Sequence, residues 1–415
     1  MNNKNTDLKI SVCQMNSTIG DFESNIKQIL KACHNANSIE SNIIVFPELV
    51  ISGYYPGDLI NDKDFLNRNK IALDKIIHES NSFKHLTVIL GSITEFIGIG
   101  KQKHNSAIVI RNGEIITEYH KQLLPTYNIF DELRHFEPGP NENCIIEVLG
   151  YRITILICED VWNDSGTEYK INPFDGLDNS EVDLIISLNA SPSNLGKYKQ
   201  RHDTMSKICT KYEIPLLYVN CYGGQDSIVF DGSSFAMNTL GKVEYESGMF
   251  VYALDQLSFS NKGFKQLNKK NLSKYASENK DEFSYQQIKL GLRDYVKKCG
   301  FTKVIVGSSG GIDSALTIAL AVDALGAENV EAITMPSIFS SAGSTLDSKL
   351  LCDNLNVKLY TYKIQAAVDI AVKQFEDSFG TKPSSLTMEN IQARERGVGI
   401  TWQTQSSSRK FRKRK

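Results

Sequence analysis

The sequence predicts an α/β protein built from two domains. Over the first 255 residues, apolar segments of strand length alternate with segments whose apolar residues recur at helical spacing. A second alternation of this kind follows a polar, lysine-rich stretch. With 415 residues, the chain is longer than a single hydrophobic core usually supports. We therefore expect a first domain over 1–255, a linker over 256–282, a partial second domain over 283–394 and a polar, basic tail over 395–415.

The first domain is expected to be a layered α/β structure, with an α-β-β-α sandwich as its specific form. The helical segment 22–38 places its apolar residues on one face, as a helix covering a sheet does. Asn112-Gly113 joins two β-branched segments into a hairpin. Strands flanked on both sides by helices give this layered fold. The strand-like segments lie at 8–15, 42–49, 86–93, 152–158, 183–190 and 214–220.

The second domain is expected to open a doubly wound parallel sheet. Within 302–316, TKVIVGSSGGIDSAL, a strand runs through a tight loop directly into a helix. Glycines let backbone N–H groups approach a ligand, serines add hydroxyl donors, and the helix N-terminus is positive, so we predict an anion cradle. A turn with no ligand is the alternative. The cradle residues are Gly307, Ser308, Ser309, Gly310, Gly311, Ile312, Asp313 and Ser314.

The cradle differs from the common nucleotide-binding loop, because no lysine follows its glycines. Asp313 stands at the start of the helix instead. A carboxylate at this place suits a magnesium ion held beside a pyrophosphate, so Asp313 is the predicted metal ligand.

Composition and charge exclude several classes of protein. The net charge of −2 gives no general electrostatic case for binding nucleic acid or a membrane. The eight cysteines are scattered without a C-x-x-C pair, so neither a disulfide framework nor a zinc site is expected. The first residues lack the apolar core of a signal peptide, and no apolar run approaches the length that spans a bilayer. We expect a cytoplasmic protein.

Three residues of the first domain have the chemistry of an amide-cleaving site. Glu48 ends a strand-like segment, Lys121 follows another, and Cys158 ends the apolar run RITILIC. A thiolate is a nucleophile that a nearby lysine favours, and a carboxylate can carry the proton. The alternative is a buried structural cysteine with a glutamate and a lysine on the surface.

The segments around these residues resemble the three catalytic blocks of the nitrilase superfamily. They are FPEL, KQLLPTYNIFDELRHFEPG and ICEDVW, and they occur in the order of the family. The resemblance implies that Glu48 is the general base, that Lys121 stabilises the tetrahedral intermediate and that Cys158 forms a thioester. It also matches Tyr127, Ser191 and Lys197 to positions that hold glutamine, with Glu132 and Glu159 as candidate partners of the substrate ammonium.

The second domain resembles the ATP pyrophosphatase enzymes through SGGIDS, their pyrophosphate loop. MPSIFSSAGSTLDS resembles a block typical of NAD synthetases. MENIQAR resembles the block that meets the deamidated dinucleotide, with Asn390 at the binding position. A nitrilase-type glutaminase followed by these blocks is the arrangement of the glutamine-dependent NAD synthetases.

The resemblance implies a reaction in two parts. Glutamine is hydrolysed at Cys158, and the ammonia passes to the second domain. There ATP and magnesium adenylate the carboxylate of deamido-NAD, and ammonia displaces AMP to give NAD. Ammonia escapes protonation only if bulk water is excluded, so a shielded path is expected. The family also implies a homo-oligomer.

The family pattern is expected to stop after Arg394. The segment 395–415 is polar, and six of its last seven residues are basic. We interpret it as sequence from a shifted reading frame, with a basic arm for RNA as the alternative. Two other interpretations of the whole chain remain open. One is a free-standing glutaminase or carbon-nitrogen hydrolase with an inactive ligase domain, and the other is a non-enzymatic fragment.

Overall fold

The computed structural model describes residues 6–163, 168–177, 179–260, 263–268 and 279–412. The chain divides into two compact units, Met1–Gly291 and Leu292–Lys415. Each unit is described by itself. Among the described residues, no helix has both the length and the apolar character needed to cross a membrane.

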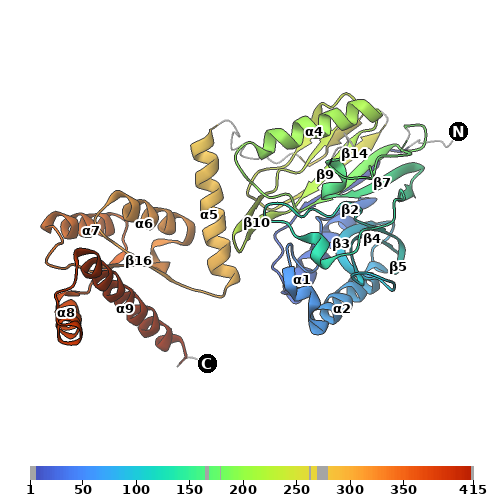
Figure 1. The fold of residues 1–415 in the computed structure, drawn as a ribbon. Coiled ribbons are helices and arrows are strands. Elements are labelled where there is room, and N and C mark those ends of the chain that lie inside the picture. Colours follow the sequence, from blue (N-terminus) through green and yellow to red (C-terminus); the bar gives the residue numbers. More distant parts are fainter. Residues whose placement is uncertain (1–5, 164–167, 178, 261–262, 269–278, 413–415) are drawn as a thin grey trace. The chain divides into compact units, whose positions relative to one another are not determined.

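The first unit contains two β-sheets packed face to face (Figure 1). The seven-stranded sheet has the order β15-β14-β1-β2-β3-β4-β5 and the six-stranded sheet the order β13-β12-β9-β8-β7-β6. The first sheet consists of β1 (Leu8–Gln14), β2 (Ile43–Val45), β3 (Thr87–Glu95), β4 (Lys103–Arg111), β5 (Glu114–His120), β14 (Ala253–Ser260) and β15 (Gly263–Gln266). The second consists of β6 (Ile145–Val148), β7 (Tyr151–Ile157), β8 (Leu184–Asn189), β9 (Leu216–Asn220), β12 (Phe235–Met237) and β13 (Val243–Glu246).

Helices cover the outer faces of both sheets, which confirms the predicted α-β-β-α sandwich (Figure 1). Strand β1 illustrates this layering, because its side chains point alternately into two different apolar cores. Ile10 and Val12 belong to the core between the sheets, whereas Cys13 belongs to the core under the helices. The elements outside the sheets are α1 (Phe22–Ser38), α2 (Lys63–Ser80), α3 (Glu132–His135), α4 (Lys197–Tyr212), the short helices η1 (Gly57–Asn61) and η2 (Cys158–Val161), and the ribbon of β10 (Tyr222–Gln225) and β11 (Ile228–Asp231).

The second unit has a parallel sheet of order β16-β17-β18, as predicted for its opening strands. Its apolar core forms between this sheet and the helices that follow the strands. The strands are β16 (Val304–Gly307), β17 (Val330–Thr334) and β18 (Lys358–Thr361). The helices are α6 (Ile312–Leu325), α7 (Ala342–Asn354), α8 (Gln365–Phe379) and α9 (Ser385–Arg412), with η3 (Ala327–Asn329) before β17.

The predicted linker 256–282 differs from the structure. Strand β14 continues to Ser260 and β15 pairs with it, so residues to 266 belong to the first unit. Polar side chains suggested a loop here, but they have buried partners: Gln256 donates to the Ser41 hydroxyl at 2.8 Å. The unit boundary falls at residue 291, within α5 (Lys280–Lys298). The linker stretch 269–278 lies outside the described residues.

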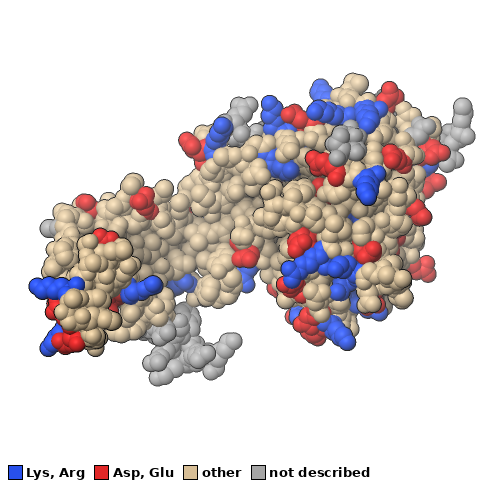
Figure 2. Space-filling view, in the orientation of Figure 1, with Lys and Arg blue, Asp and Glu red and all other residues tan. Residues whose placement is uncertain are grey.

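The predicted tail 395–415 also differs from the structure. Helix α9 runs from Ser385 through residue 395 to Arg412 without interruption. Part of this stretch packs on the second unit, since the Gln403 amide donates to the Glu331 carboxylate at 3.4 Å. On the side of each unit that Figure 2 draws, acidic and basic side chains are interspersed.

Gly91 in β3 allows the turn after β2 to lie directly against the strand. A Cβ atom at Gly91 would lie 2.2 Å from the Leu49 amide nitrogen and 2.7 Å from Glu48 Cα. Both atoms belong to the backbone, which cannot give way as a flexible side chain can. Because Gly91 has no side chain, the backbone of Glu48 can lie directly against β3, and this contact fixes the position of the Glu48 backbone.

We predict that Gly91→Ala destabilises the first unit by about 1–3 kcal/mol, the usual cost of overpacking. The measurement is urea unfolding followed by the fluorescence of Trp162 in a Trp402→Phe background, since these are the only two tryptophans of the chain. Gly343→Ala is the control, because a Cβ atom there would meet only the Ser341 hydroxyl, at 3.8 Å. An unchanged midpoint for Gly91→Ala would contradict the close approach.

Candidate active site

The structure gathers Glu48, Lys121 and Cys158 at one buried place in the first unit. Glu48 lies in the turn after β2, Lys121 follows β5 and Cys158 begins η2 after β7. Their residues are only 2%, 1% and 7% exposed. The Lys121 ammonium lies 2.7 Å from a Glu48 carboxylate oxygen. The charges of both residues act on the Cys158 thiol.

The Glu48 carboxylate is fixed by three donors. Besides Lys121, the Asn105 amide of β4 donates to Oε1 at 2.7 Å and the Ala190 N–H donates to Oε2 at 3.0 Å. Because Ala190 follows β8 of the other sheet, both sheets hold this one side chain. The sequence prediction missed Asn105, whose only signal was an amide beside an apolar strand. It also missed Ala190, whose backbone group gives no sequence signal at all.

Glu132 is a structural partner of Lys121, which corrects its proposed role in binding the substrate ammonium. Its carboxylate is fully buried, 2.9 Å from the Lys121 ammonium, and accepts a hydrogen bond from the Tyr54 hydroxyl at 2.8 Å. Burial raises the pKa of Glu132 to about 7; Lys121 opposes this shift and Glu48 adds to it. Burial alone would lower the pKa of Lys121, but Glu132 and Glu48 raise it well above its usual value.

Lys121 favours the Cys158 thiolate, as expected, but the pKa of the thiol is still raised well above its ordinary value. Burial is the main cause that raises the pKa of the thiol, Glu48 raises it further, and Lys121 opposes them without reversing the shift. A thiol with a raised pKa acts as a nucleophile only when a base takes its proton. The backbone of Cys158 adopts φ of 44°, which turns the chain sharply at the end of β7.

Asp160 ties the Cys158 turn to the segment that carries Lys121. Its Oδ1 accepts the N–H groups of Gln122 at 3.0 Å and Leu123 at 2.8 Å. Its Oδ2 accepts the Ile157 N–H at 3.0 Å and the Tyr119 hydroxyl at 2.9 Å. The sequence prediction missed this role, although a carboxylate two residues after Cys158 was the signal. Asp160 thus fixes the residues that flank Lys121 relative to the thiol.

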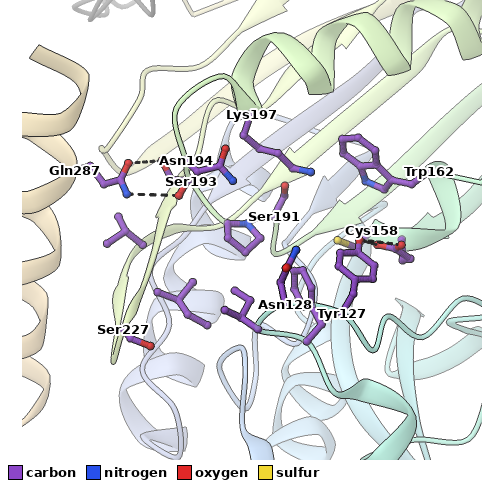
Figure 3. Close-up of a pocket in the computed structure, with 16 residues that line it drawn as sticks. Tyr127, Asn128, Cys158, Trp162, Ser191, Ser193, Asn194, Lys197, Ser227 and Gln287 are labelled. Carbon is purple, nitrogen blue, oxygen red and sulfur yellow. Dashed lines mark hydrogen bonds between the residues drawn. The ribbon is translucent and has the colours of Figure 1, made fainter. Parts of the chain in front are cut away.

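A cavity of about 380 Å³ opens onto the thiol, and Tyr127, Ser191 and Lys197 line it as predicted for one site (Figure 3). The Lys197 ammonium lies 3.9 Å from the ring centroid of Trp162, within range of a cation–π interaction. Burial lowers the pKa of Lys197.

Glu159 supplies the negative charge of the same cavity. Its carboxylate accepts the Tyr127 hydroxyl at 3.0 Å and the Tyr169 hydroxyl at 2.9 Å. Tyr169 is a further residue that the sequence did not indicate. A cation and a carboxylate on the wall of one cavity suit a small molecule that carries both charges.

The predicted anion cradle borders a separate cavity of about 530 Å³ in the second unit. Gly307, Ser308 and Ser309 line it, together with residues that include Ser344 and Arg396. Gly310 has φ of 80°, and a Cβ atom there would lie 2.4 Å from the Ser344 carbonyl oxygen, so glycine is required.

The other residues predicted to bind ligands in the second unit do not line this cavity. Gly311, Ile312 and Asp313 are exposed, Ser314 is half-buried, and its hydroxyl accepts the Ser309 N–H at 3.2 Å. Asn390 is exposed on α9 and does not line the cavity.

The donor set around the cradle fits a magnesium ion that is bound mainly through a substrate. Among the described residues, no cluster of three or more His, Cys, Asp or Glu side chains could hold a metal. Magnesium commonly uses one or two carboxylates together with substrate phosphates. The exposed carboxylate of Asp313, one of the cradle residues, is a ligand of this kind.

Two family models match the chain. The carbon-nitrogen hydrolase model matches residues 9–248 and the NAD synthase model matches residues 284–409. The second match continues well past Arg394, so the expectation that the family pattern stops there is wrong.

Similar proteins match most of the chain. A glutamine-dependent NAD(+) synthetase of Acinetobacter baylyi is 34% identical over 392 residues, which is 94% of this chain and 69% of that protein. The structure of glutamine-dependent NAD+ synthetase from Acinetobacter baumannii in complex with ADP superposes with a TM-score of 0.86 at 31% identity, covering 96% of this chain and 73% of that one. An amidase of the nitrilase superfamily from Nesterenkonia shares the fold at a TM-score of 0.54 and 18% identity, over 62% of this chain and 92% of its own.

The state of the thiol gives a direct prediction. Alkylation of Cys158 by iodoacetamide, followed by mass spectrometry of its peptide, should still accelerate as the pH passes 9, the ordinary thiol value, because burial and Glu48 raise the pKa. Glu48→Gln removes a negative charge and should move the profile about 1–3 pH units lower. Glu118→Gln, a carboxylate on β5, is the control. A Glu48→Gln profile identical to that of the wild type would show that Glu48 does not act on the thiol.

Proposed function

Because the chain belongs to the family of glutamine-dependent NAD(+) synthetases, we propose that Cys158 hydrolyses glutamine and that the 307–314 loop binds the ATP used for amidation. The chain is an ATP-dependent carbon–nitrogen ligase with glutamine as its amido donor. The contact between the buried Lys121 ammonium and Glu48, 2.7 Å apart beside the thiol, is the observation that carries the assignment of residues.

Glutamine hydrolysis begins with a proton transfer. The Glu48 carboxylate takes the proton of the Cys158 thiol as sulfur attacks the carboxamide carbon. The Lys121 ammonium stabilises the oxyanion that forms, because in a buried site its charge is little screened. Glu48 then gives the proton to the leaving nitrogen, ammonia departs and a thioester remains. Water activated by the same carboxylate releases glutamate.

The cavity is proposed to hold the two charged ends of glutamine. Lys197 and the Ser191 hydroxyl are assigned to the α-carboxylate, and Glu159, with the Tyr127 hydroxyl beside it, is assigned to the α-ammonium. The support is the placement of Lys197 and Glu159 on one cavity wall. Glu132 is left out, since Lys121 and Tyr54 already engage it.

The second unit is proposed to bind ATP through backbone N–H groups and hydroxyls of residues 307–314. Asp313 would hold magnesium, which neutralises phosphate charge when bound. Asn390 remains the proposed contact with deamido-NAD(+), which its exposed position on α9 allows. The carboxylate of deamido-NAD(+) then attacks the α-phosphorus of ATP and pyrophosphate leaves. Ammonia displaces AMP from the resulting adenylate to give NAD(+).

Two variants should separate the two reactions. Cys158→Ala should reduce NAD formation from glutamine by about a thousandfold or more, because the nucleophile is lost, while NAD formation from ammonium salt persists. Gly310→Ala should have the opposite effect, since its Cβ atom would meet the Ser344 carbonyl at 2.4 Å and distort the loop while glutamine hydrolysis continues.

Both reactions are assayed on one preparation, by glutamate release and by NAD formation from deamido-NAD(+) and ATP. Cys144→Ala is the control, as this cysteine is half-buried and outside the cavity. Full glutamine-dependent activity in Cys158→Ala would rule out the assigned nucleophile. Wild-type hydrolysis without NAD formation from either nitrogen source would favour a free-standing glutaminase.

A further inference from the structure

Helix α5 contributes residues to both compact units. Its first part, up to Gly291, belongs to the first unit, and Leu292 packs in the core of the second. Phe283 and Leu290 are 5% and 3% exposed and cluster with Met249 and Phe250. The rings of Phe250 and Phe283 lie 5.3 Å apart. The first half of α5 is thus anchored by apolar contacts, although the NAD synthase match already begins at residue 284.

On this half of α5, Gln287 contacts Ser193 in two ways (Figure 3). The Ser193 hydroxyl donates to Gln287 Oε1 at 3.1 Å, and Gln287 Nε2 donates to the Ser193 carbonyl at 3.5 Å. Gln287 also lines the cavity that contains the thiol. Spacings of four and three residues place it on the same face as Phe283 and Leu290.

Ser193 belongs to the segment 190–197, which connects β8 to α4 and carries both residues assigned to the glutamine carboxylate. Asn220 Oδ1 accepts the Ser191 N–H at 2.9 Å. The Val229 carbonyl accepts the Ser193 N–H at 2.7 Å. Gln287 adds a side-chain contact to Ser193, from a helix that is distant in the sequence.

We propose that Gln287 is a positioning residue for the glutamine site. It acts through Ser193, and it fixes the segment on which Ser191 and Lys197 stand. The proposal rests on the proposed function, because it assumes that these two residues bind the substrate carboxylate. It also means that the match to the NAD synthase family includes a residue that serves the hydrolysis of glutamine.

The contact can be removed without removing the helix. Gln287→Ala deletes both hydrogen bonds but leaves Phe283 and Leu290, the apolar anchors of α5, in place. Gln286→Ala is the matched control: it is equally half-buried, and its amide donates to Glu282 of the same helix, at 2.8 Å.

The test measures KM and kcat for glutamine hydrolysis in the full chain, together with NAD formation from ammonium salt. For Gln287→Ala we expect KM for glutamine to rise about three- to tenfold, the effect of one to two neutral hydrogen bonds. We expect kcat within about twofold of the wild type, since the reacting groups are untouched. The ammonium-dependent reaction should be unchanged.

Two results would overturn the proposal. One is a wild-type KM in Gln287→Ala; the other is a parallel loss of kcat and of ammonium-dependent activity, which would make Gln287 a packing residue only. Failure of the proposed function gives a different result. In that case the wild-type protein would not hydrolyse glutamine, or Cys158→Ala would hydrolyse it, whatever residue occupies position 287.

Discussion

The buried contact of one ammonium with two carboxylates is the constraint on which the first unit depends. Removing charges from water costs several kcal/mol per ion, so Lys121 is tolerated only because Glu48 and Glu132 lie beside it. The two carboxylates outnumber the single cation, and neutral donors from Tyr54 and Asn105 meet the excess charge. Burial and the charge of Glu48 raise the pKa of the Cys158 thiol, and Lys121 opposes them.

This cluster can form only where the two sheets meet. Glu48 and Lys121 follow strands of the seven-stranded sheet, whereas Cys158 follows a strand of the six-stranded one. A glycine allows the segment around Gly139 to lie against the backbone next to Lys121. A Cβ atom at Gly139 would lie 2.2 Å from the His120 carbonyl oxygen, and the Gly139 N–H donates to the Lys121 carbonyl at 2.8 Å. Asp160 then joins the two sides through hydrogen bonds. The packing of the sheets therefore sets the geometry of the chemistry.

Much of this was predictable from the sequence, and the exceptions have a common cause. Residue types, apolar strands and short motifs indicated Cys158, Glu48 and Lys121 as residues of one site. They could do so because a buried strand restricts the position of the residue that directly follows it. The sequence could not show which charge neutralises which, so the contact of Glu132 with Lys121 and the rise in the thiol pKa caused by burial were not foreseen. Gln256 misled for the same reason, since its partner is about two hundred residues away in the chain. Asn105 contributes through a contact that only the folded chain creates.

The anchoring of α5 has a practical consequence for dividing this protein into fragments. The polar, lysine-rich composition of residues 256–282 suggests ending a first-domain fragment at residue 255 or 282. Such a fragment would lack Phe283, Gln287 and Leu290. Met249 and Phe250 would then lose the apolar surface that covers them, and the fragment would tend to aggregate for reasons unrelated to its chemistry. A soluble piece for screening inhibitors of the thiol should therefore extend to at least residue 291.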